Sequence, residues 1–337
     1  MSTRIAGMGW VTPLGADLDA VYQRIATGEV GEAKPVTNPE TGRVHSCIPV
    51  PPKLVEHLGR NPRLRRSSVI SYFAVAAAMA ALENAGLQVT PDLAHRIAVI
   101  FAVTDGGVVY TRKFYDQIVK QGANAASPLL FPETVYNAPA SHLAAQLGVD
   151  GATYTLVGDS AAGLAAVHLG EQLLDLGEAD YCVVVGCEEL DWILCEAYRT
   201  WRFTRAPLAE GAAALVLARE GRHTIAPTGG VPFFRQRDAA GALEKVLGKL
   251  TSNEKPDFAI AGDDATFADR AIASALGYSC PAVAKIPSPK RSFGEMLAAG
   301  GLASVIYAAL HLEKSDARSA LVPVVGLNYQ ADAALIT

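Results

Sequence analysis

Two stretches of the sequence, GDSAAGL at residues 158–164 and GEMLAAGGL at residues 294–302, decide the fold class. Each turn leads into a helix rich in small residues and then into an apolar strand, at residues 181–186 and 321–326. Glycine suits such turns because it adopts backbone conformations that other residues avoid. A unit that occurs twice predicts two related halves, 1–220 and 221–337, whose turns face one shared cleft.

The composition indicates a large α/β protein. Of 337 residues, 50% are hydrophobic and 19% are charged, which is enough apolar material for a core of several layers. The segment 97–103 is apolar throughout, as is typical of a strand covered on both faces. The alanine-rich segment 67–85, ended by Gly86, predicts a closely packed helix. We also expect a helix over 108–121 and a strand over 154–157.

The charge distribution argues against nucleic acid as a ligand. The net charge is −5 and the isoelectric point is about 5.8, whereas nucleic-acid-binding domains are usually basic. One short segment is nevertheless basic, with Arg60, Arg63, Arg65 and Arg66. Such a cluster is either a solvated surface or a docking site for an acidic partner.

The cysteines and the N-terminus indicate a protein of a reducing compartment. Five cysteines lie at irregular spacings without a C-x-x-C pair, so neither disulfides nor a zinc site is predicted, and no cofactor or other metal is expected. The first residues lack the order of a signal peptide, and no apolar run reaches the roughly 18 residues that span a bilayer. We therefore expect a cytoplasmic protein without a membrane span.

Several segments in order resemble the β-ketoacyl synthase branch of the thiolase-fold superfamily. They include IAGMGWVTPLG at 5–15, FAVAAAMAALENAGL at 73–87, NAPASHLA at 137–144 and AEGAAALVL at 209–217. Each of these segments alone is weak evidence for the resemblance, but together, in this order, they cover nearly the whole chain. The resemblance implies an α/β thiolase fold, in which duplicated βαβαβ halves form five layers, αβαβα.

The same resemblance implies that the catalytic residues are replaced. Active members use a cysteine at a helix N-terminus and two histidines, and these positions hold Ser160, Gly262 and Glu295 here. The two histidine positions are assigned from GDDAT at 262–266 and KRSFGE at 290–295, which correspond to the family's HGTGT and KSxxGH. Lys290 is retained, so the fold is expected to survive without its active centre.

Two further family positions also differ. A glutamate of the second buried helix corresponds to Ser304, and the GFGG loop that gates the acyl pocket corresponds to LNYQ at 327–330. In character the chain is closest to a chain-length factor, the inactive ketosynthase-like subunit that pairs with an active ketosynthase.

The first functional hypothesis is therefore a non-catalytic subunit. By resemblance it forms a heterodimer through the strand at 152–157 and shapes the acyl tunnel in polyketide, polyene or fatty-acid-like biosynthesis. Val109, Phe114 and Tyr115 would line that tunnel, although aromatic residues at helical spacing are more often core. An acidic acyl carrier protein would dock on Arg63, Arg65 and Arg66.

The second hypothesis is a serine-dependent acyltransferase or hydrolase. Ser160 begins a helix, where backbone N–H groups could stabilise an oxyanion, but a serine hydroxyl needs a neighbouring base. The candidates are His142, His168 and Lys290. His168 lies about 12 Å along the helix from Ser160, which is too far for a hydrogen bond. His142 is expected to be structural, and Lys290 is expected to pair with Glu295.

The serine also has a purely structural interpretation. Asp159 or Ser160 could cap the first helix by accepting hydrogen bonds from its free N–H groups, and Glu295 could do the same at the second helix. No catalysis is needed to explain any of the three.

Overall fold

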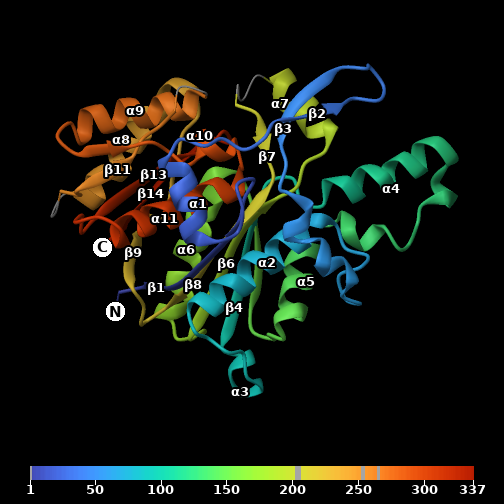
Figure 1. Ribbon diagram of the computed structural model, residues 1–337, viewed down its shortest axis with the longest axis horizontal. Helices are drawn as coiled ribbons and strands as arrows, with labels where there is room; N and C mark the ends of the chain where they lie inside the picture. Colours follow the sequence, from blue (N-terminus) through green and yellow to red (C-terminus); the bar gives the residue numbers. More distant parts are fainter. Residues whose placement is uncertain (1, 202–205, 252–254, 264–265) are drawn as a thin grey trace.

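Two five-stranded arrays join into one mixed sheet in the computed structural model, which describes residues 2–201, 206–251, 255–263 and 266–337 (Figure 1). The first array runs, in spatial order, β5 (Thr153–Val157), β4 (Ile97–Val103), β6 (Tyr181–Glu188), β8 (Gly211–Ala218) and β1 (Arg4–Val11). The second runs β12 (Ala284–Ile286), β11 (Phe258–Ile260), β13 (Ala320–Val325), β14 (Gln330–Ile336) and β9 (His223–Pro227). A short antiparallel contact between β1 and β9 connects the arrays.

The two arrays repeat one pairing pattern. In each, the second strand is parallel to both of its neighbours, and the next two pairings are antiparallel. The predicted duplication of βαβαβ halves is therefore confirmed. The division of the chain into domains at residues 220 and 221 stays a prediction.

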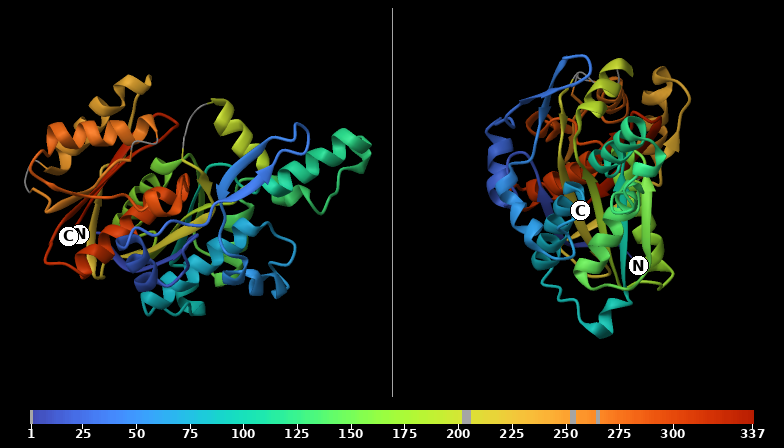
Figure 2. Two further views of the ribbon diagram at one scale, coloured as in Figure 1. Left: turned by 45° about the horizontal axis from the view of Figure 1, so that its top comes forward. Right: turned by 90° about the vertical axis from the view of Figure 1, so that its right-hand side faces the viewer.

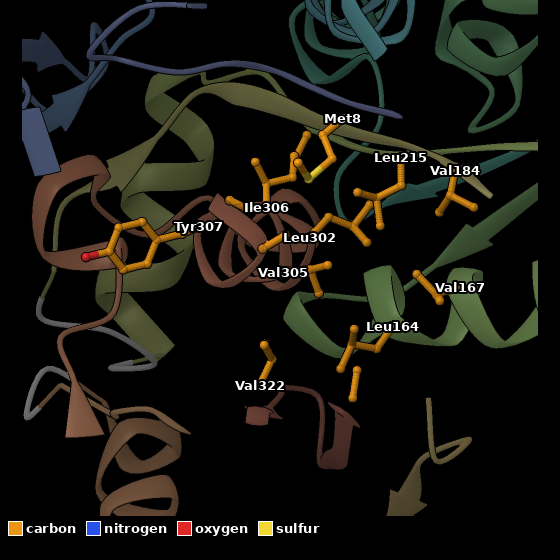
Figure 3. Packing of buried hydrophobic residues seen from close by; sticks show 14 of the residues in the cluster. Met8, Leu164, Val167, Val184, Leu215, Leu302, Val305, Ile306, Tyr307 and Val322 are labelled. Carbon is orange, nitrogen blue, oxygen red and sulfur yellow. The ribbon is translucent and has the colours of Figure 1, made fainter. Parts of the chain in front are cut away.

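Two central helices lie between the arrays and form the middle layer. They are α6 (Ser160–Asp175) and α11 (Ala298–Glu313), and they pack directly on each other. Small residues permit this approach, because a Cβ on Gly301 would lie only 2.4 Å from the carbonyl oxygen of Ser160. Figure 3 shows the apolar side chains between them and the strands, among them Leu164, Val167, Leu302, Val305 and Leu215.

Outer helices complete the five layers. α2 (Val69–Asn84) packs on β1 and β8, and α5 (Ala138–Leu147) packs on α2. On the other side, α8 (Ala239–Thr251) and α9 (Phe267–Ser279) cover β14 and β13. The expected helices and strands at 67–85, 97–103, 108–121 and 154–157 are present, with shifts of at most two residues.

Shorter elements surround this body. A small sheet contains β2 (Lys34–Thr37), β3 (Val44–Ile48) and β7 (Leu208–Ala209), and β10 (Val231–Pro232) pairs with β14. The remaining helices are α1 (Leu18–Ala26), α3 (Pro91–Ala94), α7 (Trp192–Trp201), α10 (Lys290–Phe293) and the 3₁₀ turns at 52–54, 56–60 and 236–238.

One segment stands away from the body. It consists of α4 (Val108–Gln121) and two 3₁₀ turns, η3 (Ala123–Ala125) and η4 (Phe131–Thr134), and we call residues 108–136 the arm. Figures 1 and 2 show it extending from the end of the molecule opposite α8 and α9. Val108 is the only fully buried residue of α4. The amphipathic helix α4 packs mainly on the turns η3 and η4 of the arm, so its apolar side chains are only partly covered.

Candidate functional site

The N-terminal turns of α6 and α11 meet at a small cavity. Its volume is about 60 Å³, and its lining includes Ser160, Lys290, Glu295, Ser304 and Leu327. In this measure one water molecule needs roughly 10–15 Å³, so the cavity has room for a few waters. The two predicted turns therefore do face a shared site.

Lys290 lies between two buried carboxylates. Its Nζ is 2.6 Å from Glu295 Oε2 and 2.9 Å from Asp269 Oδ2. Burial alone would lower the pKa of Lys290, but the charges of Glu295 and Asp269 outweigh it and raise this pKa above its usual range. Lys290 is therefore a permanent cation. The expected pairing with Glu295 is present, and Asp269 is a second partner that the sequence did not reveal.

Glu295 also holds the backbone at the start of α11. Its Oε1 accepts a hydrogen bond of 3.1 Å from the N–H of Leu297, the residue before α11, so it does not cap the free N–H groups of the helix itself, contrary to the capping interpretation. Leu297 has a φ of 43°, a conformation that branched residues rarely adopt. The carboxylate thus links an unusual turn to the ion pairs of Lys290. We call Lys290, Asp269 and Glu295 together the Lys290 triad.

Asp159 does not cap α6, contrary to one expectation. Its side chain makes no capping hydrogen bond, and Oδ2 instead accepts a bond of 2.8 Å from the N–H of Asn328. Its Oδ1 has no partner in the described part of the chain. Burial raises the pKa of Asp159 to about 6, because water no longer solvates the charged form.

The described part of the chain places no hydrogen-bonded base beside the serine. Ser160 is partly exposed, and no hydrogen bond joins its hydroxyl to an amine, imidazole or carboxylate within the described ranges. His142 Nε2 lies 2.6 Å from Glu133 Oε1 in a structural contact, as expected. His168 pairs with Glu171 on α6. Neither histidine lines the cavity.

The Gly262 position cannot hold a histidine in this conformation. A Cβ there would lie 2.0 Å from the carbonyl oxygen of Asp269, so any side chain would require the backbone to move. Residues 264 and 265 of the GDDAT segment lie outside the described residues. Ser304, which the resemblance assigns to a glutamate position of the family, lines the cavity, and its hydroxyl donates to the carbonyl oxygen of Gly300.

Two groups of predicted residues lie away from the cavity. Val109, Phe114 and Tyr115 belong to the arm, where the Phe114 ring centroid is 5.7 Å from that of Phe131 and Tyr115 is exposed. The arginines at 63, 65 and 66 are exposed at the turn before α2, and one of them, Arg63, donates to the carbonyl oxygen of Ala145.

Sequence reasoning missed a set of buried acids behind the cavity. Glu188 accepts a bond of 2.6 Å from the N–H of Thr104, and burial raises the pKa of Glu188 well above its usual range. Burial likewise raises the pKa of Asp105 to about 6. Glu189 accepts hydrogen bonds from the N–H groups of Ile70 and Val109, which fixes the starts of α2 and α4. The sequence signal was two glutamates directly after an apolar strand.

The described ranges contain no group of three or more histidine, cysteine, aspartate or glutamate side chains arranged to hold a metal ion. None of the helices there is both long enough and apolar enough to cross a bilayer.

The amino-acid sequence matches a known protein family. Residues 3–223 match the family model of the β-ketoacyl synthase N-terminal domain. The 3-oxoacyl-[acyl-carrier-protein] synthase 2 of Coxiella burnetii is 24% identical over 239 residues, which are 69% of this chain and 53% of the relative. The chain thus spans about half the length of this curated relative.

Solved structures of other proteins share this fold over the whole chain. The ishigamide ketosynthase/chain length factor has a TM-score of 0.84 at 18% identity, covering 100% of this chain and 99% of the other. A type II polyketide synthase acyl carrier protein in complex with its ketosynthase, AntDE:AntF, has a TM-score of 0.79 at 17% identity and covers 100% and 99%. The duplicated topology, the meeting of two helix N-termini and the family match together show that this chain belongs to the β-ketoacyl synthase family.

Proposed function

We propose that this chain is a non-catalytic ketosynthase-like subunit of the chain-length-factor type. It pairs with an active ketosynthase and shapes the acyl tunnel in polyketide, polyene or fatty-acid-like biosynthesis. The observation that carries the proposal is the Lys290 triad, because one of its members, Glu295, stands where the resemblance implies a catalytic histidine in active members.

The triad removes the chemistry that a ketosynthase needs. A condensing site requires an activated nucleophile and groups that transfer protons. Among the described residues Ser160 has no hydrogen-bonded base, and Lys290, the retained candidate, stays protonated between Glu295 and Asp269. A serine-dependent acyltransferase would need one of these groups to accept the serine proton. The geometry therefore favours the non-catalytic function over the serine-dependent one.

An open sheet edge and the arm support the pairing. β5 is the terminal strand of its array, and its residues are exposed or only partly buried. Unpaired edge strands readily add a strand from another chain. The arm exposes apolar side chains, namely Tyr115, Val119, Leu129, Phe131 and Tyr136. A related subunit that covered both features would bury them together.

The tunnel and carrier-protein roles follow from this pairing. Phe114 and Tyr115 lie on the arm, so they would contribute to a tunnel only across the interface with a partner. The exposed Arg65 and Arg66 offer cations to an acidic acyl carrier protein. We expect that charge reversal at both arginines weakens carrier binding at low salt, where exposed charges act at longest range.

Co-expression with an active ketosynthase of the same organism tests the proposal. The complex is isolated by gel filtration, incubated with acyl-loaded carrier protein, and both chains are weighed as intact proteins. We expect a mixed dimer in which the ketosynthase becomes acylated and this chain keeps its mass.

Two variants make the test specific. Val119→Asp places a charge on the apolar arm and should weaken the mixed dimer, whereas Tyr278→Ala, an exposed residue of α9, should not. An acyl adduct on this chain that is lost in Ser160→Ala would instead establish the serine-dependent acyltransferase.

A further inference from the structure

Both ends of the arm are tied to Ser68, the residue before α2. At the first end, the N–H of Val109 donates to Glu189 Oε1 at 2.9 Å, and the hydroxyl of Ser68 donates to Glu189 Oε2 at 2.6 Å. At the second end, Glu133 Oε2 accepts a bond of 3.2 Å from the N–H of Ser68. The two ends are therefore connected through one residue of the body. We call Ser68, Glu133 and Glu189 the neck.

The neck is buried and closely packed. Glu189 is 0% exposed, Ser68 1% and Glu133 7%, so a partner protein that covered the arm would not touch them. A Cβ on Gly107 would lie only 2.6 Å from the carbonyl oxygen of Glu133. A buried polar group that loses its partner costs more than the bond itself contributes. The neck therefore resists opening.

Arg112 forms a separate attachment one turn into α4. Its Nε lies 2.9 Å from both carboxylate oxygens of Asp191, the residue before α7. The Asp191 side chain is only 7% exposed, whereas that of Arg112 is 23% exposed. Two attachments at different points of α4 restrict its rotation as well as its position.

The length of α4 makes these attachments decisive for the direction of the arm. The helix has 14 residues, and Val108 is its only fully buried one. At 1.5 Å per residue it is about 21 Å long, so a rotation of about 10° at the neck would move its far end by about 4 Å. Interface backbones of preorganised complexes usually move by no more than about 1 Å. A small loosening of the neck would therefore misplace the exposed apolar side chains of the arm.

We propose that Glu133, Glu189 and Arg112 are positioning residues, which hold the arm in the direction that pairing requires. This role rests on the proposed function, because the partner is the ketosynthase proposed there. It predicts that buried residues outside the interface control the affinity of pairing. The physical reason is that a segment fixed before association does not have to be ordered during it.

Hydrogen exchange on the isolated chain tests the neck. Glu133→Ala removes the acceptor of the Ser68 N–H, whereas the amide oxygen of Glu133→Gln can still accept this bond. Exchange at the N–H of Val109 should be about tenfold faster in Glu133→Ala and remain slow in Glu133→Gln. Val109 donates to Glu189 and not to Glu133, so a faster rate shows that the two ends of the arm are coupled.

The dissociation constant of the mixed dimer tests the positioning role. Glu133→Ala should raise it by about tenfold or more, and Glu133→Gln should stay within about threefold of the wild type. Arg112→Met repeats both measurements at the separate attachment, where the partly exposed side chain favours a folded variant.

Two controls distinguish positioning from a general loss of stability. Ser71→Ala removes a buried hydroxyl of α2 that has no hydrogen-bond partner in the described part of the chain. Leu247→Ala destabilises α8, which lies at the end of the molecule opposite the arm (Figure 2). Both variants should leave the Val109 exchange rate and the affinity of pairing unchanged.

The possible failures differ in what they contradict. An unchanged Val109 exchange rate in folded Glu133→Ala refutes the neck. Faster exchange with unchanged affinity in Glu133→Ala and Arg112→Met refutes the positioning role and leaves the proposed pairing intact. If the wild-type chain forms no mixed dimer, the proposed function and the positioning role fail together, whereas the exchange rates still establish or refute the neck.

Discussion

Replacing Lys290 by methionine should destabilise the protein strongly. The change removes the cation between Asp269 and Glu295 and leaves two buried carboxylates without a counter-charge. Breaking a buried ion pair by removing one partner costs about 3–5 kcal/mol. Typical stabilities are only about 5–15 kcal/mol, so the loss would be a large part of the total. Urea unfolding of both proteins at pH 7.5 measures it.

The pH dependence of the stability loss distinguishes the effect of uncompensated charge from that of a packing defect. A protonated carboxyl carries no uncompensated charge, so the deficit of Lys290→Met should shrink between pH 7.5 and pH 5. A packing defect alone would be independent of pH. Arg291→Met is the control, since this neighbouring side chain is 57% exposed and its ion pair should contribute less than about 1 kcal/mol. A loss below about 1 kcal/mol for Lys290→Met, equal at both pH values, contradicts the assigned role of the triad.

Three further predictions concern the central helices, Asp159 and the arm. Gly301→Ala should cost about 1–3 kcal/mol by overpacking against Ser160, whereas Gly248→Ala on α8, with nothing within 4 Å of the added Cβ, should be neutral or stabilising in urea unfolding. The pKa of Asp159 in the folded protein is about 6, above the usual 3.8, so its contribution to stability is full below about pH 4 and is lost as the pH rises through 6. Asp159→Asn should therefore remove up to about 3 kcal/mol of that pH dependence, seen as a flatter profile of urea midpoints, and an unchanged profile would contradict the assignment. Val119→Asp, at a side chain that is 80% exposed, should change the stability of the isolated chain by less than about 0.5 kcal/mol while weakening the mixed dimer in gel filtration.

The fold was largely predictable because its signals are local and repeated. The strand at 97–103 is apolar on both faces, and the helices at 67–85 and 108–121 end at glycines. The duplication was visible in two similar turns, and the strand pairing of the two arrays confirms it. The arm was not predicted, because whether a helix packs on the body depends on contacts that its own pattern does not encode.

The site was predictable in its residues but not in its contacts. Ser160, Lys290 and Glu295 were identified from the sequence, and the pairing of the last two was expected. The contact of Asp269 with Lys290 was not predicted, because Asp269 lies on α9, 21 residues before Lys290 in the sequence. The aromatic rings of Phe233, Phe267 and Tyr329 pack on one another from three separate segments, so no local sequence pattern could reveal this contact.

The two positions that the resemblance assigns to the catalytic histidines share one consistent packing arrangement. Gly262 lies against the backbone of Asp269, whose side chain binds Lys290, and Lys290 in turn binds Glu295. A histidine at position 262 would displace Asp269, and a histidine at position 295 would remove one of the two anions that balance Lys290. Each reversion would therefore disturb a contact on which the next residue depends. The two positions are thus coupled through Asp269 and Lys290, so a change at one is expected to disturb the other.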